Sequence, residues 1–382
     1  MTFLTVALIC AGLLTGIASA QGQIEISEAE DLTEVSVEGN YIVVNDIDAS
    51  GIEDFEPIGD EENRFVGSFD GDGYVISGLT VNGSDSEHVG FFGYVGSEGT
   101  VTNVGLENVE VTGGDSTGGL VGRNEGEVRR SHATGSVEGA NNVGGLVGRN
   151  IESISESYAS ASVVGEDRVG GLVGRNVGSI SESYSAGSVE GVSAVGGAVG
   201  SNVGEITDTY TTADVEGDRG MGGLIGSNVA GTVERTYAGG SMGAGTASGG
   251  LIGTSNTEVI DSYWNTETLS EGGFEGGVAL TTEEMTGDAA VGNMDFDFEE
   301  VWESRDGDYP VLAWQVHGYG NPPENADISF GDGEEEKENE EEENETENQT
   351  GYQPPGQGLP GFGVVVAVLA LLVGGVALRT RR

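Results

Sequence analysis

Cysteine, lysine and histidine are almost absent from this chain. Its 382 residues contain one cysteine (Cys10), three histidines and one lysine (Lys337) among 14 basic residues. If Cys10 is removed with the apolar run around it, no disulfide can form. The histidines His88, His132 and His317 are far apart, and none stands in the His-Glu-x-x-His setting of a zinc protease. We predict no catalytic residue, cofactor or metal site.

Positive charge is equally scarce. The chain has 65 acidic residues and 14 basic ones, for a formal net charge of −51. Such a surface repels nucleic acid and anionic lipid, so nucleic acid is not expected as a partner. In molar salt the Debye length falls to about 3 Å and this self-repulsion is screened. The acid-rich, lysine-poor composition resembles that of haloarchaeal proteins, which implies a protein adapted to very salty water.

A repeat built around Gly-Gly-Leu-Val-Gly runs through the middle of the chain. Successive copies are 26 residues apart, and 27 at the last step, when aligned on Gly119, Gly145, Gly171, Gly197, Gly223 and Gly250. A divergent earlier copy places Gly90 29 residues before Gly119. A fixed period of this length indicates a solenoid, in which each unit buries its apolar face by stacking on the next.

The apolar columns of the repeat indicate β-structure. One column holds Val128, Ile154, Ile180, Ile206, Val233 and Val259, and a second holds His132, Tyr158, Tyr184, Tyr210, Tyr237 and Tyr263. Such residues, bounded by Gly, Ser or Asn, suit short strands, and no sustained 3.6-residue period indicates helices. We predict an all-β protein, a parallel β-helix of seven or eight turns. Each turn would hold two or three strands, with turns about 4.8 Å apart.

A charged column separates these two apolar columns. It comprises Arg130, Glu156, Glu182, Asp208, Arg235 and Asp261. Strict alternation would bury it, so we expect a bend or bulge that turns the charges outward and both apolar columns inward. Glycines are expected at corners with positive φ or close backbone contact. Asn124, Asn150, Asn176, Asn202 and Asn228 recur at the same period and predict an amide ladder.

The repeat wording GGLVGRN…I…S-Y…G-S-V resembles the GLUG motif, named for its Gly-Leu-hydrophobic-Gly core. Residues 55–83 are similar to the lead-in found before such repeats, and the stretch from SYWNTET to YPVLAWQ is similar to their closing segment. The resemblance covers roughly residues 35–315. GLUG repeats occur in surface proteins, including non-catalytic parts of some immunoglobulin A proteases, so the resemblance implies surface exposure and adhesion-like roles without a fixed ligand.

Both ends of the chain carry targeting signals. The first apolar run ends in Ala18-Ser19-Ala20, which fits signal-peptide cleavage after Ala20, although no basic residue precedes the run. The alternative is an N-terminal membrane anchor. Near the other end, Pro360-Gly361-Phe362, an apolar run and a basic tail resemble the PGF-CTERM sorting signal. That resemblance implies an archaeosortase that exchanges the tail for a membrane lipid; the alternative is a permanent transmembrane helix.

These features divide the chain into six segments. They are a signal peptide (1–20), an N-terminal cap and lead-in (21–85), the solenoid (86–263), a closing segment (264–320), an acidic disordered stalk (321–358) and the sorting signal (359–382). We expect residues 22–60 to cap one end of the solenoid and residues 264–315 the other. Sequons at Asn82, Asn344 and Asn348 are candidates for N-glycosylation.

Other motifs are weaker. GGSMG around Ser241 matches a nucleophile elbow, but Ser241 aligns with the serine of GSV in other turns and no αβ-hydrolase pattern surrounds it. Asp70-Gly-Asp72 begins like a calcium loop but lacks the later ligands, so a tight turn is expected. Glu156 and Glu182, one turn apart, could serve catalysis or bind a divalent cation, although every polar column of a solenoid has this spacing.

Arg123, Arg149 and Arg175 form a basic stripe on the acidic body. The stripe could bind anionic glycans, or pair with nearby acids such as Glu125 and Glu152.

Together the patterns predict an exported, membrane- or lipid-anchored surface protein for adhesion, cell–cell contact or envelope structure, with surface glycans or other surface proteins as partners. The competing hypothesis is an enzyme that acts on extracellular polysaccharide through the acidic face of the solenoid.

Overall fold

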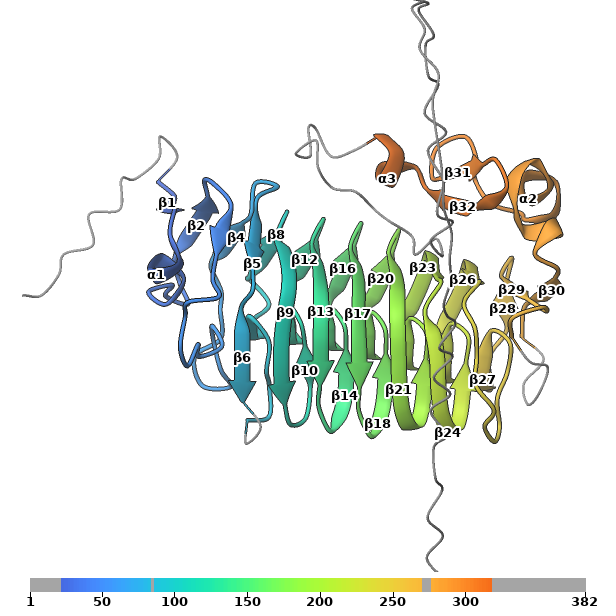
Figure 1. The fold of residues 1–382 in the computed structure, drawn as a ribbon, viewed down its shortest axis with the longest axis horizontal. Helices are drawn as coiled ribbons and strands as arrows, with labels where there is room; N and C mark the ends of the chain where they lie inside the picture. The colour runs from blue at the N-terminus through green and yellow to red at the C-terminus, as the bar shows by residue number, and fades with distance from the viewer. Residues whose placement is uncertain (1–21, 84–85, 270–275, 318–382) are drawn as a thin grey trace, which may run out of the picture. The chain divides into compact units, whose positions relative to one another are not determined.

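The computed structural model describes residues 22–83, 86–269 and 276–317. They form a parallel β-solenoid of about nine turns, which confirms the predicted fold class with slightly more turns than expected (Figure 1). The chain separates into two units, 1–326 and 327–382, and all described residues belong to the first. No helix among them is long and apolar enough to cross a membrane. Ala20, Asn344, Asn348 and the sorting signal Pro360, Gly361 and Phe362 lie outside the described residues.

Short strands and one helical turn open the chain. They are β1 (Ile24–Ile26), α1 (Ala29–Leu32), β2 (Asn40–Val43), β3 (Ile47–Asp48), β4 (Ser68–Asp70), β5 (Val75–Ser77) and β6 (Thr80–Gly83). One face of the repeats is a 7-stranded sheet of β7 (Phe92–Val95), β11 (Val121–Asn124), β15 (Val147–Asn150), β19 (Val173–Asn176), β22 (Val199–Asn202), β25 (Ile225–Asn228) and β27 (Ile252–Ser255).

The remaining repeat strands belong to a 23-stranded sheet that wraps the other faces. Those before or across the charged column are β8 (Thr100–Thr102), β12 (Glu127–Arg129), β16 (Ser153–Ser155), β20 (Ser179–Ser181), β23 (Glu205–Thr211), β26 (Thr232–Ala238) and β28 (Val259–Ile260). Those after it are β9 (Gly105–Gly113), β13 (His132–Glu138), β17 (Tyr158–Val164), β21 (Tyr184–Gly196), β24 (Asp214–Gly222) and β29 (Tyr263–Asn265). Short strands precede the glycine pair: β10 (Thr117–Gly118), β14 (Asn141–Gly144) and β18 (Asp167–Gly170).

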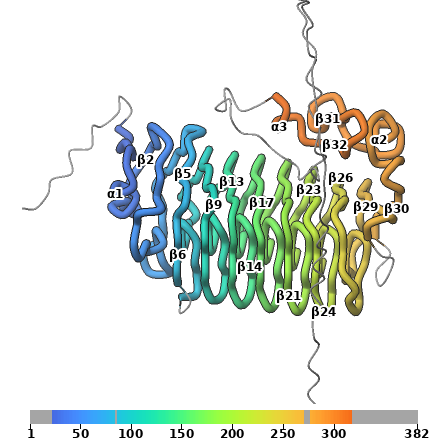
Figure 2. The backbone as a smooth tube through the Cα atoms, viewed as in Figure 1, coloured from blue at the N-terminus to red at the C-terminus, as the bar shows by residue number. Residues whose placement is uncertain are grey.

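A regular turn therefore contains four short strands, not the two or three expected from sequence. The strands β15, β16, β17 and β18 make one such turn, and each pairs in parallel with its equivalent in the next. Figure 2 shows the successive turns stacked side by side. The pairing keeps each residue type over its copy, so Tyr158 lies against Tyr184 and Val163 against Val189.

The core is a column of apolar side chains that runs along the axis. Each turn contributes inward residues from several strands, such as Leu146, Ile154, Val163 and Val169, all fully buried. Burial of one such side chain contributes about 1.5–3 kcal/mol, so the stack gains its stability turn by turn. In the first turns phenylalanines take over this role; they are Phe55, Phe65, Phe69, Phe91 and Phe92. Leu32 of α1 is buried against the same core at that end.

The predicted bend at the charged column is present in every regular turn. Its six residues all have left-handed backbone, with φ between 44° and 50°. The next residue supplies the hydrogen bonds that the corner needs. The Ser157 hydroxyl accepts from the backbone N–H of Ser131 (3.1 Å) and donates to the carbonyl of Ser155 (2.7 Å). Because one left-handed residue turns the chain at this corner, the inward and outward alternation of side chains in the next strand is shifted by one residue.

The repeated glycines serve close backbone contact. A Cβ on Gly171 would lie 2.2 Å from the carbonyl oxygen of Gly197 on the next turn. Some repeat glycines also have positive φ, such as Gly187, but at the corners positive φ falls mainly on other residues, including Asn142, Arg168 and Ala194. Neighbouring turns approach so closely at the glycine pair that a side chain there would displace backbone, whereas the left-handed corners leave room for one.

The predicted asparagine ladder is confirmed. Each Nδ2 donates to the Oδ1 of the next asparagine, at 2.9 Å for the first three steps and 3.0 Å for the step to Asn228. Each amide also donates to backbone carbonyls at its own corner, such as that of Gly178 for Asn176 (3.2 Å). The five side chains are buried, so the ladder fixes the corner beside the 7-stranded sheet.

The tyrosine column does not point into the core, which corrects the prediction. After the left-handed corner, alternation turns Ala159 inward and Tyr158 outward. The outward tyrosines are covered by the C-terminal elements β30 (Val278–Leu280), η1 (Glu283–Met285), α2 (Gly287–Asn293), β31 (Trp302–Arg305), β32 (Asp308–Leu312) and α3 (Ala313–His317).

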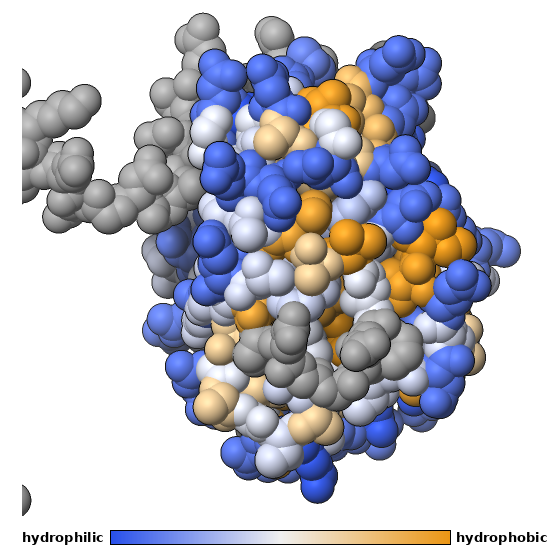
Figure 3. Space-filling model, turned by 90° about the vertical axis from the view of Figure 1, so that its right-hand side faces the viewer, coloured by the Kyte–Doolittle hydropathy of each residue, from blue (hydrophilic) through white to orange (hydrophobic). Residues whose placement is uncertain are grey.

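The strand β30 pairs with β29 on the last turn, so this part of residues 264–315 covers the end as expected. The elements α2, β31, β32 and α3 run back along the side of the solenoid instead. In Figure 1 they lie, in orange, beside the edge that carries β20, β23 and β26. The final turn is covered less completely, because Ile260 and Val278 are about half exposed. Figure 3 looks at that end and shows apolar side chains gathered among hydrophilic ones.

Candidate functional site

An arginine ladder occupies the outer face of the 7-stranded sheet. The ladder consists of Arg123, Arg149 and Arg175 on β11, β15 and β19, in direct register across the three strands. Its first member is well held. The Arg123 Nη2 donates to Glu125 Oε1 at 2.6 Å, and its guanidinium lies 4.8 Å from the centre of the Tyr94 ring. Arg64 covers the same ring and pairs with the same carboxylate at 2.9 Å.

The other two arginines have no such partner. Within the described ranges no ion pair joins Arg149 or Arg175 to an acid. The predicted pairing of the stripe with nearby acids is therefore confirmed for Arg123 with Glu125, and no ion pair with Glu152 is found in these ranges. Five buried side-chain polar atoms of the described residues lack a hydrogen-bond partner, and three are the Nε atoms of this ladder. Burial, with the charges of Arg123 and Arg175, lowers the pKa of Arg149. The ladder is thus partly desolvated and incompletely neutralised.

The charged column on the opposite side of the asparagine corner is largely neutralised. Glu156 accepts from Arg129 Nε (2.9 Å) and from Arg130 Nε (2.9 Å). Burial opposes ionisation of Glu156, but these hydrogen bonds hold its pKa below the usual range. Asp208 forms a two-pronged pair with Arg235, with N–O distances of 2.9 and 2.8 Å.

Glu182 lies between these two pairs and is the exception in the column. Its pKa is raised by burial and by the neighbouring carboxylates of Glu156 and Asp208. Two adjacent carboxyls with opposite pKa shifts resemble an acid and base pair in principle. However, arginines occupy the oxygens of Glu156, and Trp314 donates to the backbone carbonyl of Glu182 at 2.9 Å. No group of acids and histidines among the described residues has the arrangement of a metal site.

The tyrosine ladder is a continuous aromatic stack under the C-terminal segment. Adjacent rings from His132 to Tyr237 are nearly parallel, with centroids 4.7 to 5.0 Å apart. The buried Trp302 packs on this stack and donates its Nε1 to Asp208 Oδ1 at 3.1 Å. The Tyr237 hydroxyl donates to the carbonyl of Pro310 at 2.7 Å. These contacts make the column an internal packing surface, so it is not free to bind a ligand.

The remaining candidates from sequence have structural roles. Burial lowers the pKa of His132 to about 4, so its ring is neutral where it ends the aromatic stack. His317 pairs with Glu303 at the surface (2.9 Å), and His88 packs edge-on against Tyr94. Ser241 donates its hydroxyl hydrogen to the carboxylate of Asp214 at 2.5 Å, whereas the serine of a nucleophile elbow donates to a histidine.

Two sites near the lead-in keep their expected form. Asp70 accepts from the backbone N–H of Asp72 at 2.9 Å, which makes the tight turn between β4 and β5. Asn82 is exposed on β6, so a glycan there would meet no steric barrier from the core. Its glycosylation stays a prediction.

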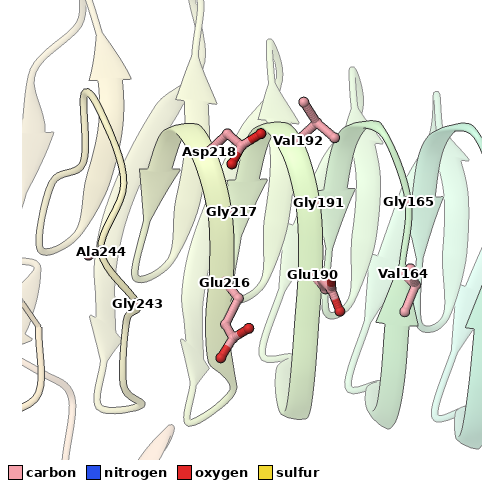
Figure 4. Close-up of a pocket in the computed structure, with 10 residues that line it drawn as sticks. All are labelled: Val164, Gly165, Glu190, Gly191, Val192, Glu216, Gly217, Asp218, Gly243 and Ala244. Carbon is pink, nitrogen blue, oxygen red and sulfur yellow. The ribbon is translucent and has the colours of Figure 1, made fainter. Parts of the chain in front are cut away.

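A shallow acidic groove of about 480 Å³ crosses the corner between β17, β21 and β24. Figure 4 shows Glu190 and Glu216 on neighbouring turns, with Val164 beside them and Asp218 on the adjoining corner. The carboxylates are surface groups and no basic side chain lines the groove. Its residues follow the repeat, so the groove arises from the stacking and has no residue that breaks the rhythm.

The fold and its outward ladders define a class: a parallel β-solenoid of stacked, glycine-rich turns. The GLUG motif matches residues 113–138 and 139–164, which form two successive turns of the stack. The chain is also 36% identical over 139 residues to halomucin of Haloquadratum walsbyi, and 37% identical over 97 residues to a protein provisionally described as a Gly-rich membrane protein of Evansella cellulosilytica. These matches cover 32% and 23% of this chain, but only 2% and 11% of those relatives.

A solved structure shares the fold. It is a crystal structure provisionally described as an immunoglobulin A1 protease from Bacteroides ovatus, with a TM-score of 0.57 and 21% sequence identity. The similarity covers 78% of this chain and 94% of that one. At this identity the likeness concerns the fold alone.

Proposed function

We propose that this chain is an exported surface protein of a haloarchaeon, held at the cytoplasmic membrane and facing outward. Its solenoid would serve adhesion, cell–cell contact or envelope structure. The observation that carries the proposal is the regular stack of turns, in which Glu156 and Asp208 of the charged column pair with arginines and the tyrosine ladder is covered by the C-terminal segment. Such a stack is a stiff rod with a long repetitive surface, which suits contact with other surfaces. The similarity to halomucin and to a Gly-rich membrane protein supports a surface location.

The proposed anchor is the C-terminal signal around Pro360, Gly361 and Phe362, processed by an archaeosortase and joined to a membrane lipid. The acidic segment before it, with Asn344 and Asn348 as glycan sites, would hold the solenoid away from the membrane. Intact-mass and peptide mass spectrometry of the protein from its native membrane fraction tests this. A chain that ends near Pro360 and carries a lipid supports the signal. An intact C-terminus at Arg382 means a transmembrane anchor instead.

The outward location has its own test. Intact cells are treated with a protease that cannot enter them, and released peptides are identified by mass spectrometry. We expect peptides from residues 22–317 to appear while those of a cytoplasmic marker do not. Adhesion is then measured by comparing aggregation of cells with and without the protein. The surface proposal is contradicted if the protein stays unchanged on intact cells while the same treatment cleaves it in lysed cells. Unchanged aggregation contradicts only the adhesive role.

A second candidate is hydrolysis of extracellular polysaccharide at Glu156 and Glu182, whose pKa values shift in opposite directions. The pairing of Glu156 with two arginines weighs against it, since a nucleophile or base needs free oxygens. The acidic groove includes no residue of this column, and neither does a second cavity, which residues of α1 line together with Asp46 and Glu53. Assay of reducing ends released from acidic polysaccharides decides the matter. Activity that is lost in Glu182→Gln would establish the enzyme.

A further inference from the structure

The arginine ladder is unusual in a chain of net charge −51. Arg64 and Arg123 share one carboxylate, Glu125, and no ion pair of the described residues neutralises Arg149 or Arg175 beside them. Other arginines of the described residues pair with acids, as Arg168 does with Asp167 at 3.1 Å and Arg235 with Asp208 at 2.8 Å. Like charges one strand spacing apart repel each other, and here they are kept together on a rigid sheet. An anion that binds across several arginines would relieve this repulsion and so stabilise the arrangement.

We infer that the arginine ladder binds an acidic polysaccharide along the solenoid axis, through the sulfate or carboxylate groups of the polymer. The parallel register sets the three arginines in single file on neighbouring strands, with a strand spacing of about 4.8 Å. A linear polymer with one oxyanion on each sugar presents a matching single file. Arginine suits this role because its planar fork can hold two oxygens of one oxyanion.

The surroundings favour a polysaccharide over a folded protein partner. Beyond the asparagine corner, the turns of Arg149 and Arg175 continue with the apolar residues Ile151 and Val177, both partly exposed. Such residues can meet the C–H faces of sugar rings. The ladder is narrow and lies on a flat sheet face, without the large aromatic anchors that dominate protein interfaces.

Partial burial also suits binding in salty water. Exposed charges lose their attraction beyond about 3 Å in molar salt, whereas partly buried pairs are screened much less. The Nε atoms of all three ladder arginines are buried, so the guanidinium groups have already lost part of their hydration. Oxyanions that contact the remaining N–H groups directly therefore keep much of their binding energy. The inference names a ligand class for the proposed surface role and takes the outward location from it.

Binding is tested on the full chain, solubilised in a nonionic detergent and immobilised on a biosensor. The probes are dextran sulfate, polygalacturonate and neutral dextran, each in 0.2 M and 2 M KCl. We expect binding to at least one of the two anionic polymers and none to neutral dextran. The anionic polymer that binds more tightly identifies the preferred group as sulfate or carboxylate.

The decisive variant is Arg149→Gln with Arg175→Gln, which should weaken binding at least tenfold. The matched control is Arg168→Gln with Arg219→Gln, which removes the same charge from the exposed corner and should change binding less than twofold. Arg149→Lys with Arg175→Lys keeps the charge but loses the fork, so severalfold weaker binding is expected. Circular dichroism checks folding. If the glutamine pair does not fold, each single glutamine variant and the lysine pair give the same comparison.

Three results would overturn the inference. They are no binding of either anionic polymer, equal binding of neutral dextran, or equal weakening by the ladder and control variants. Because the assay uses purified protein, these results concern only the ladder. The proposed surface location fails or stands separately, by the protease test on intact cells.

Discussion

Replacement of Asn176 by alanine removes the middle step of the buried asparagine ladder. The Asn176 amide donates to Asn202 Oδ1 (2.9 Å) and to the carbonyl of Gly178 (3.2 Å), and its Oδ1 accepts from Asn150 Nδ2 (2.9 Å). Some neighbours keep other partners, since Asn150 Nδ2 still reaches the carbonyl of Ser179 at 3.2 Å. Two or three net hydrogen bonds are lost, at about 1 kcal/mol each. With a small cavity added, we expect a loss of about 3 kcal/mol in the free energy of unfolding.

The assay is urea unfolding followed by circular dichroism, at pH 7 and a fixed 2 M KCl. The matched control is Asn141→Ala, which removes an amide that donates to Asp115 at the surface. A surface bond of this kind should contribute less than about 0.5 kcal/mol. Midpoints are compared because a solenoid need not unfold in a single step. Equal midpoints for the two variants would refute the argument that the ladder acts as a buried hydrogen-bonded column.

Three further predictions concern the charged column, the C-terminal segment and the glycine pair. Because burial and two neighbouring carboxylates raise the pKa of Glu182, its ionised form lowers stability once pH rises past that pKa. Glu182→Gln should therefore raise the melting temperature at pH 7 but not at pH 4; the same gain at both pH values would contradict this. Trp302→Ala should cost about 3–5 kcal/mol locally and make residues 276–317 sensitive to limited proteolysis while the solenoid stays resistant; unchanged resistance would show that Trp302 does not hold the segment. Gly171→Ala should lower stability by about 2–4 kcal/mol, since its Cβ would meet the next turn's backbone. Gly51→Ala, where nothing lies within 4 Å, should change stability by less than about 0.5 kcal/mol, and thermal melts compare the two.

The repeat period by itself determined the fold class. A 26-residue spacing that places valine over valine and asparagine over asparagine allows only a stack of equivalent turns. The same spacing predicted the amide ladder and the bend at Glu156, because a charge between two apolar residues cannot follow simple strand alternation. Such features depend on contacts between equivalent residues of neighbouring turns, and these residues are identified by the repeat period alone.

Only the tertiary structure decided which way the tyrosines face. One left-handed residue at the corner shifts the alternation of the following strand, so Ala159 points inward and Tyr158 outward. The covering segment is far away along the chain; Trp302 reaches Asp208, 94 residues earlier. The same limit applies to the arginine ladder, where Arg149 and Glu152 are near in sequence but form no ion pair. The spacing of the repeat determines which residues stack on one another. The backbone geometry at the corners and the packing of distant segments determine which other residues each stack contacts.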